Sequence, residues 1–219
     1  MRLEPVDVLK VARRVADHAI RLADPHADVG GLRCARVAVD GAVPADTALV
    51  ADAIGEAVRE AGRPVVRGST GDYLRPRSVR LEHGPDDPDV GYERWVDHLA
   101  LRRELLDPLG PGGDLTYLPT FWDPESDRSP RATPVRALPG SVAVVDGPFL
   151  LRWETADAFD VSVHLLVSDA ALARRLPRSD VVRVTGAWRR YAEETWPEER
   201  ADVVLRFDRP SHPARVLTA

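Results

Sequence analysis

An apolar strand, a glycine turn and a helix follow one another between residues 36 and 53, RVAVDGAVPADTALVADA. Nucleotide-binding proteins use this order of elements to present backbone amides to a phosphate at a helix N-terminus. A second short strand at residues 63–66 completes a strand–helix–strand unit. Such a unit predicts a parallel sheet with a right-handed crossover.

The residues of this turn differ from those of a phosphate-binding loop, G-x-x-x-x-G-K-[ST]. Counted from Gly41, the turn is one residue short, and Ala45 and Asp46 stand where the second Gly and the Lys belong. Pro44 removes an amide, and a carboxylate repels a triphosphate. Gly41 and Thr47 remain candidates for binding an anion, but we expect no efficient use of Mg-ATP and assign no cofactor.

Length and composition indicate one α/β domain. The chain has 219 residues and a net charge of −5, so a nucleic-acid partner is not favoured. No apolar run reaches the length of a membrane span and no signal-peptide core is visible, so we expect a cytoplasmic protein without a membrane partner. Cys34 is the only cysteine, and the histidines lack metal-ligand spacing, so we expect no metal site. A homo-oligomer remains open.

The remaining elements follow from periodicity and from turn residues. Helices are expected at residues 5–23 (ended by the glycine turn at 30–31), 44–61, 92–107, 169–176 and 187–195, and strands at 141–145, 161–167 and 201–207. Prolines and aromatic residues across 114–138 predict an irregular excursion or a small β-ribbon. Residues 68–77 and Asp146 follow strands at the sheet edge where ligands of parallel sheets bind.

The side chains near that edge include candidate ligand-binding groups. Arg75 and Arg77 are candidates for an anion, and Asp72 and Asp146 for acid–base or electrostatic work. Tyr117 and Trp122 would either stack on a flat ligand or fill the core of a small subdomain. His164 alternates with apolar residues and is expected to be structural.

The succession of GDYLRPR, LRRELLDPLGPGGDLTY, FWDPESDR, VAVVDGPFLLR and RADVVLRFDRP resembles the uridine kinase family of P-loop nucleoside kinases, most closely its actinobacterial uridine kinase-like members. The likeness spans residues 36–217. It implies a single domain over residues 1–219, built as a three-layer sandwich with a parallel sheet flanked by helices. It also implies a nucleoside-binding excursion at about 110–140 and a short lid at about 174–190.

Carried over by position, the resemblance implies an incomplete kinase site. Gly71 occupies the position of the family's catalytic Asp, with Asp72 beside it, and Asp146 stands where the family has an acid near magnesium. The resemblance also implies substrate contacts by Tyr73, Arg75, Trp122, Asp127 and Arg128, and phosphate contacts by the lid arginines Arg174, Arg175 and Arg178.

Three functions therefore remain open for the chain. The first is a repurposed enzyme that acts on a small molecule, nucleoside-like or anionic, through Asp72 and Asp146 without efficient phosphotransfer. The second is a non-catalytic pseudokinase that only binds its ligand, and the third is an atypical nucleoside kinase. We favour the first because the carboxylates, arginines and aromatic residues are grouped on loops that follow strands.

Overall fold

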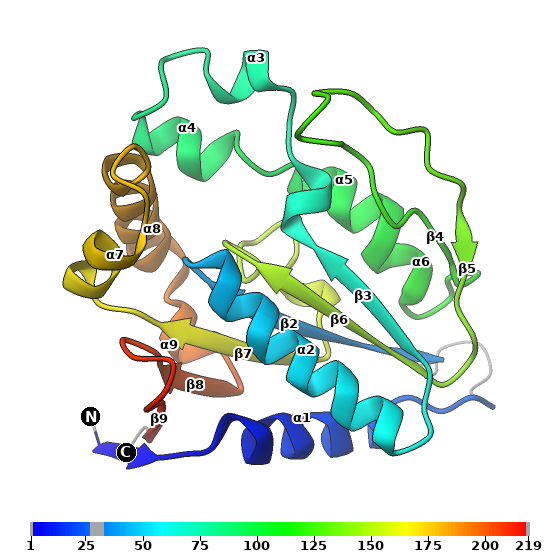
Figure 1. Cartoon of the computed structure of the whole chain (residues 1–219). Helices are drawn as coiled ribbons and strands as arrows, with labels where there is room; N and C mark the ends of the chain where they lie inside the picture. The colour runs from blue at the N-terminus through cyan, green and yellow to red at the C-terminus, as the bar shows by residue number, and fades with distance from the viewer. Residues whose placement is uncertain (1, 27–32, 218–219) are drawn as a thin grey trace.

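The computed structural model describes residues 2–26 and 33–217. Its main sheet has seven strands in the order β1–β9–β8–β7–β2–β6–β3 (Figure 1). The strands are β1 (Arg2–Pro5), β2 (Cys34–Gly41), β3 (Val65–Ser69), β6 (Ser141–Gly147), β7 (Val161–Leu166), β8 (Val203–Arg206) and β9 (Ala214–Leu217). The five from β3 to β8 in this order run parallel, whereas β9 and β1 are antiparallel additions. The predicted parallel sheet flanked by helices is confirmed.

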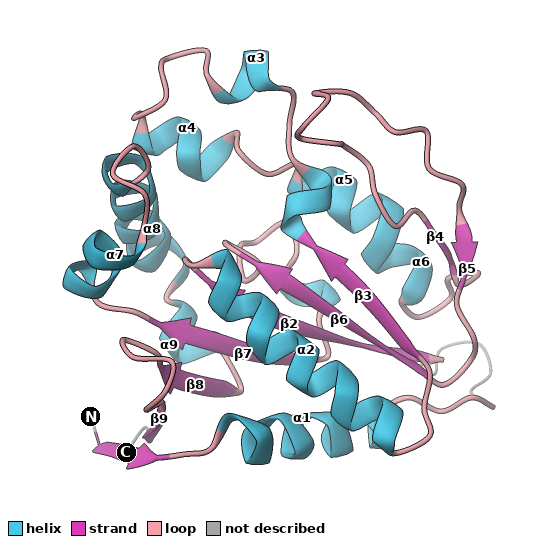
Figure 2. Cartoon of the chain, in the orientation of Figure 1, coloured by secondary structure: helices cyan, strands magenta, loops and turns pink. Residues whose placement is uncertain are grey.

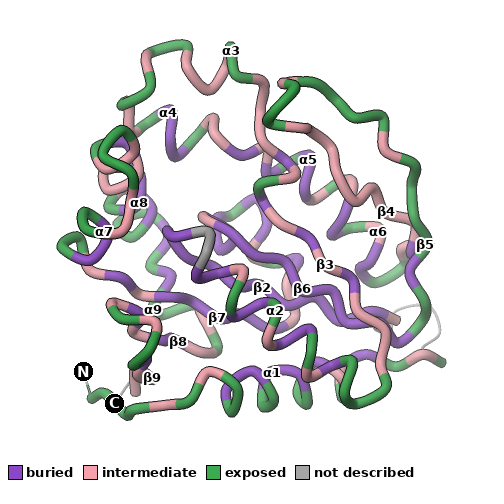
Figure 3. Tube along the Cα trace, in the orientation of Figure 1, coloured by how far each residue is buried: buried purple, intermediate pink, exposed green. Residues whose placement is uncertain are grey.

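The centre of the sheet is formed by β2 and β6, which are buried along their whole length (Figure 3). Both strands are nearly continuous apolar runs that end in Asp-Gly, VAVDG and VAVVDG. Strands covered on both faces need such runs, because alternate polar residues would be buried without partners. The two Asp-Gly ends therefore lie next to each other at the carboxyl edge of the sheet.

Helices cover the two faces of the sheet (Figure 2). Helices α1 (Val8–Leu22) and α2 (Pro44–Glu60) pack side by side on one face. Helix α1 begins later than predicted because the Asp7 side chain accepts the Leu9 amide hydrogen bond and caps the helix. The glycine turn predicted at residues 30–31 lies outside the described residues.

Three helices follow β7. They are α7 (Asp169–Arg175), α8 (Val181–Thr195) and α9 (Pro197–Arg200), and the 3₁₀ turn η3 (Ala156–Ala158) precedes β7.

The single helix predicted over residues 92–107 is wrong. The chain instead forms α4 (Pro88–Glu93), α5 (His98–Leu101), the π-helical turn η2 (Arg102–Leu106) and α6 (Asp107–Leu109). The break between α4 and α5 arises because residues 95–97 pair with the chain after β3: Asp97 donates its amide to Tyr73, and Arg75 donates its amide to Trp95. These tertiary bonds compete with helical ones, and Asp97 then caps α5.

The excursion contains a two-stranded ribbon of β4 (Thr116–Tyr117) and β5 (Val135–Arg136). Both predicted features, irregular chain and a small β-ribbon, are therefore present. The excursion contacts the 3₁₀ turn η1 (Thr70–Tyr73), because the carbonyl of Asp72 accepts the amides of Phe121 and Trp122. The next helix, α3 (Arg77–Arg80), lies with α4 beyond the arrowheads of β3 and β6 (Figure 1).

Two edge strands were not predicted. Arg2 pairs with Leu217, so β1 and β9 bring the two ends of the described chain together. The range predicted for a lid, about 174–190, covers the end of α7, a short turn and the first part of α8. Within residues 2–26 and 33–217, no helix combines the length and the apolar character needed to cross a membrane.

Candidate functional site at the carboxyl edge of the sheet

Three parallel strands bring their last residues together at this edge. In the register of the sheet, Asp146 of β6 stands beside Ser69 of β3 and beside Val39 of β2. The turn into α2 follows β2, and η1 follows β3. Asp146 lies at the end of β6, Asp72 in η1 and Thr47 in the first turn of α2, so their side chains surround one region of the fold.

The start of α2 uses its own backbone amides internally. The amides of Asp46 and Thr47 both donate to the carbonyl of Val43, at 3.0 and 3.2 Å. Gly41 lies tight against this turn, because a Cβ atom there would be 2.8 Å from the Thr47 methyl carbon. The turn is therefore closely packed. Of Pro44 and Ala45, only the backbone course is described.

Asp46 is buried and forms an ion pair with Arg175, which reaches it from the end of α7. Arg175 also donates to the carbonyl of Phe207 at 3.2 Å. The second carboxylate oxygen of Asp46 is buried without a hydrogen-bond partner among the described residues. Arg175, predicted to bind phosphate, thus contacts the predicted phosphate-binding turn, but its charge is neutralised there by Asp46. Arg174 and Arg178 are exposed.

Asp146 is held between a hydroxyl and a guanidinium group. The Thr47 hydroxyl donates to one oxygen at 3.1 Å, and Arg67 Nη2 donates to the other at 3.0 Å. The Arg67 guanidinium also bonds the carbonyl of Val144 at 2.7 Å and the Asp52 carboxylate at 3.0 Å. Burial raises the pKa of Asp146, and the Arg67 charge opposes that rise. Sequence reasoning missed Arg67, whose alternating position in β3 gave no signal of this contact.

Asp72 is the candidate carboxylate with no ion pair among the described residues. It is half-buried in η1, and its nearest side-chain partner is the Thr120 hydroxyl at 3.5 Å. Burial raises the pKa of Asp72, and the negative charge of Asp146 raises it further. A carboxyl group of raised pKa near a second carboxylate is suited to proton transfer.

The predicted aromatic residues have different surroundings. Tyr73 is fully buried, stacks on Phe121 and donates its hydroxyl to the carbonyl of Leu118, so it supports the excursion from within the core. Tyr117 is half-buried in the ribbon, where β4 pairs it with Val135 of β5. Trp122 donates its indole N–H to Asp127 at 3.1 Å.

Asp127 joins the excursion to the segment after η1. Its carboxylate accepts the backbone amide of Arg77 at 2.8 Å as well as the indole of Trp122. The side chains of Arg77 and Arg128 are exposed, whereas Arg75 keeps 34% of its side-chain surface and has a long ion pair, 3.8 Å, with Asp97. The structure therefore brings Asp72 and Asp146 together at the edge, places Arg75 shortly after η1 and places Tyr117 in the ribbon.

A buried network behind the turn was not foreseen. Asp40, immediately before Gly41, accepts hydrogen bonds from the Leu150 amide at 2.9 Å and the Tyr191 hydroxyl at 2.9 Å, and lies 2.7 Å from His164 Nδ1. The rings of His164 and Trp188 stack with centroids 5.8 Å apart. The one available signal was an Asp within an apolar strand, since such a carboxylate needs partners. His164 has the structural surroundings that its alternation indicated.

Among residues 2–26 and 33–217, no group of three His, Cys, Asp or Glu side chains is arranged to hold a metal ion. The sheet order β3–β6–β2–β7–β8, with a turn leading from β2 into α2, defines the class of the fold: it is a P-loop-kinase-like α/β fold. No protein-family model matches the sequence, and no curated protein matches it.

Solved structures of P-loop kinases share this fold. A possible uridine kinase from Bacillus stearothermophilus is 23% identical, with a TM-score of 0.68 over 88% of this chain and 97% of that one. A proposed fructose transport system kinase from Silicibacter sp. TM1040 is 18% identical, with a TM-score of 0.60 over 84% and 94%. A D-glycerate 3-kinase from Cryptococcus neoformans is 13% identical, with a TM-score of 0.57 over 88% and 89%. Identities this low establish the fold alone.

Proposed function

We propose that this protein binds a small molecule at the carboxyl edge of its sheet and does not transfer phosphate from ATP efficiently. The ion pair between Asp46 and Arg175 is the observation that carries the proposal. A P-loop kinase needs an uncompensated cation at this point to hold the β- and γ-phosphates. Here the cation is already neutralised, and the amides of Asp46 and Thr47 are bonded to Val43.

The residues at the position of the metal in a phosphotransfer site do not fit Mg²⁺ either. P-loop enzymes hold Mg²⁺ between the loop Ser or Thr and a strand-end Asp. Thr47 and Asp146 are close enough to do so, but the Arg67 guanidinium is bonded to the same carboxylate. A cation of fixed charge next to the metal ligand disfavours a divalent ion by direct repulsion. The residues present therefore do not fit a magnesium triphosphate, and no step is assigned to one.

The ligand is expected to be a small hydroxylated molecule, nucleoside-like or anionic. The fold neighbours are described as a possible uridine kinase, a proposed fructose transport system kinase and a D-glycerate 3-kinase, and uridine, fructose and D-glycerate all carry hydroxyl groups. These names belong to those proteins, and the fold by itself does not pass on a substrate. A cytoplasmic location and the absence of nucleic-acid and membrane partners stay predictions, and homo-oligomer formation stays open.

Isothermal titration calorimetry of Mg-ATP tests this proposal. We expect no saturable binding to the wild-type protein and at least tenfold tighter binding to the variant A45G/D46K/R175A. That variant supplies the second Gly and the Lys of the loop pattern, and it removes Arg175 because two cations would otherwise face each other. A tenfold gain corresponds to about 1.4 kcal/mol.

The matched control is Arg175→Ala alone, which leaves the Asp46 carboxylate facing the turn and should bind no ATP. Wild-type turnover of ATP with a small hydroxylated acceptor at the ~1–100 s⁻¹ typical of kinases would overturn the proposal. Tight Mg-ATP binding without turnover would favour a nucleotide-binding pseudokinase instead.

Asp72 favours chemical action on the ligand over binding alone, because no arginine of the described residues pairs with it and burial raises its pKa. A ligand that raises the melting temperature can be incubated with the protein and followed by mass spectrometry. We expect slow conversion by the wild type and at least a hundredfold loss in Asp72→Asn, the loss typical for a general acid or base. An unchanged circular dichroism spectrum of Asp72→Asn would show that the variant is folded. A ligand that stays intact with the wild type would identify a non-catalytic binding protein.

A further inference from the structure

Three buried nitrogen atoms near the carboxyl edge lack hydrogen-bond partners among the described residues. They are Nε of Arg75 and both ring nitrogens of His98. His98 is only 4% exposed, so its ring faces the interior. Buried polar atoms without a partner are rare in folded proteins, and each one calls for a group that completes its hydrogen bonds.

The two residues belong to neighbouring segments. Residues 73–75 and 95–97 are joined by the Leu74–Val96 bridge and by the hydrogen bonds that Arg75 makes with Trp95 and Asp97 makes with Tyr73. His98 is the first residue of α5, immediately after this pairing, and Arg75 lies three residues after Asp72. The unpartnered atoms therefore lie on two segments that are joined to each other, and one of these segments also carries Asp72.

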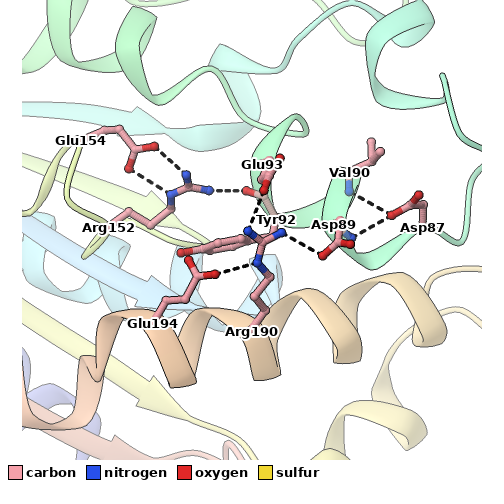
Figure 4. Close-up of polar contacts among 9 residues, drawn as sticks. All are labelled: Asp87, Asp89, Val90, Tyr92, Glu93, Arg152, Glu154, Arg190 and Glu194. Atoms are coloured by element: carbon pink, nitrogen blue, oxygen red, sulfur yellow. Dashed lines mark hydrogen bonds and ion pairs between the residues drawn. The ribbon is translucent and has the colours of Figure 1, made fainter.

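The other cation near His98 is not available to a ligand. Arg152 is buried, bonds the Glu154 carboxylate at 2.6 and 3.0 Å, donates to the carbonyl of Tyr92 and stacks on the Tyr92 ring (Figure 4). Arg190, on the other side of that ring, is bonded to Asp89, Glu93 and Glu194 (Figure 4). These arginines hold α4, α8 and the chain after β6 together, and their charge is compensated.

The positive charge of Arg75 is only weakly compensated by a neighbouring carboxylate. Its contact with Asp97 is 3.8 Å long, and the Asp97 carboxylate is shared with the Ala100 amide, which it caps at 3.0 Å. The guanidinium group is partly exposed, so an anion from solvent can reach it. A weakly compensated guanidinium group attracts one negative charge. Its planar pair of N–H groups can donate two parallel hydrogen bonds to a carboxylate.

His98 contributes a neutral donor and acceptor. Burial lowers the pKa of His98 to about 3, and the charges of Arg152 and Arg75 act in the same direction. A neutral imidazole offers one N–H and one lone pair, which suits a hydroxyl group rather than a second anion. The neighbouring arginines also disfavour a cationic ligand.

We propose that Arg75 and His98 form a subsite for a small hydroxy-carboxylate, with Arg75 bound to the carboxylate and His98 to a neighbouring hydroxyl group. This inference rests on the proposed function, because it names the class of molecule that the carboxyl edge binds. It assigns a role to His98, the first residue of α5.

Matched pairs of probes test the proposal on the full chain. D-Glycerate is compared with glycerol, D-gluconate with D-glucose, and orotidine with uridine, by thermal shift and then calorimetry at equal concentrations. At least one carboxylate is expected to bind at least tenfold more tightly than its neutral counterpart. Arg75→Gln should weaken that carboxylate at least tenfold, and His98→Leu should weaken it while keeping the protein folded. Arg13→Gln, an exposed arginine of α1, is the matched control and should change nothing.

Neutral members that bind as well as the carboxylates would overturn the subsite, and so would the absence of binding by all three carboxylates. Unchanged carboxylate affinity in His98→Leu would show that His98 faces buried water only. None of these outcomes tests whether the protein binds ATP or transfers phosphate from it. The proposed function fails separately, if the wild type transfers phosphate from ATP.

Discussion

Replacing Asp40 with alanine is expected to lower the free energy of unfolding by about 3–5 kcal/mol. Asp40 is fully buried, and its carboxylate satisfies the Leu150 amide, the Tyr191 hydroxyl and His164 Nδ1. Alanine would leave all three groups buried without an acceptor, and each unsatisfied group costs about 1–3 kcal/mol. Urea denaturation followed by circular dichroism measures the difference.

Two variants calibrate this result. Tyr191→Phe removes the hydroxyl that donates to Asp40 and accepts the Leu151 amide, and it should cost about 1–3 kcal/mol, less than Asp40→Ala. Glu56→Ala removes an exposed carboxylate that is paired with Arg59 on the surface, so it should change stability by less than about 1 kcal/mol. If Asp40→Ala were as stable as Glu56→Ala, the network would not support the fold.

The stability of the protein is expected to fall between pH 7.5 and pH 5 by about 2 kcal/mol through His98 alone. Burial lowers the pKa of His98 to about 3 in the folded state, against an ordinary histidine value of 6.5. Below pH 6.5 the unfolded chain therefore binds a proton that the folded chain does not. Stability is lost as pH falls below 6.5 and the loss is complete, at about 5 kcal/mol, near pH 3.

His98→Leu isolates this contribution from the titration of carboxylates. The difference in unfolding free energy between wild type and variant should be constant above pH 6.5 and should shift in favour of the variant as the pH decreases. His18→Gln, on the exposed face of α1, should follow the wild-type curve. Parallel curves for wild type and His98→Leu would mean that His98 titrates alike in both states.

Much of the architecture could be predicted because it depends on local patterns. The apolar runs that end at Asp40 and Asp146 predicted buried strands, and the turn between β2 and α2 predicted a parallel strand–helix–strand unit. The single helix predicted at residues 92–107 was wrong, because the pairing of residues 73–75 with 95–97 replaces helical bonds there. The strands β1 and β9 were missed because each depends on the other end of the chain.

The candidate site was only partly predictable for the same reason. Asp72, Asp146, Arg75 and the turn at Gly41 follow strands in the sequence, so topology alone brings them to one edge. Their charge state depends on partners far along the chain, such as Arg175, which lies 129 residues from Asp46. Arg67 carries no local signal, since an arginine that alternates with apolar residues in a strand is an ordinary residue.

The sequence by itself determined the fold class and the absence of a lysine from the turn, because both depend on residue identity and spacing. The tertiary structure decided which charges cancel and which remain. Arg175 and Arg67 neutralise Asp46 at the start of α2 and Asp146 at the end of β6, while Arg75 keeps a weakly compensated charge. The physical reason is that electrostatic interactions depend on distance and burial, and both are fixed only when distant segments pack together.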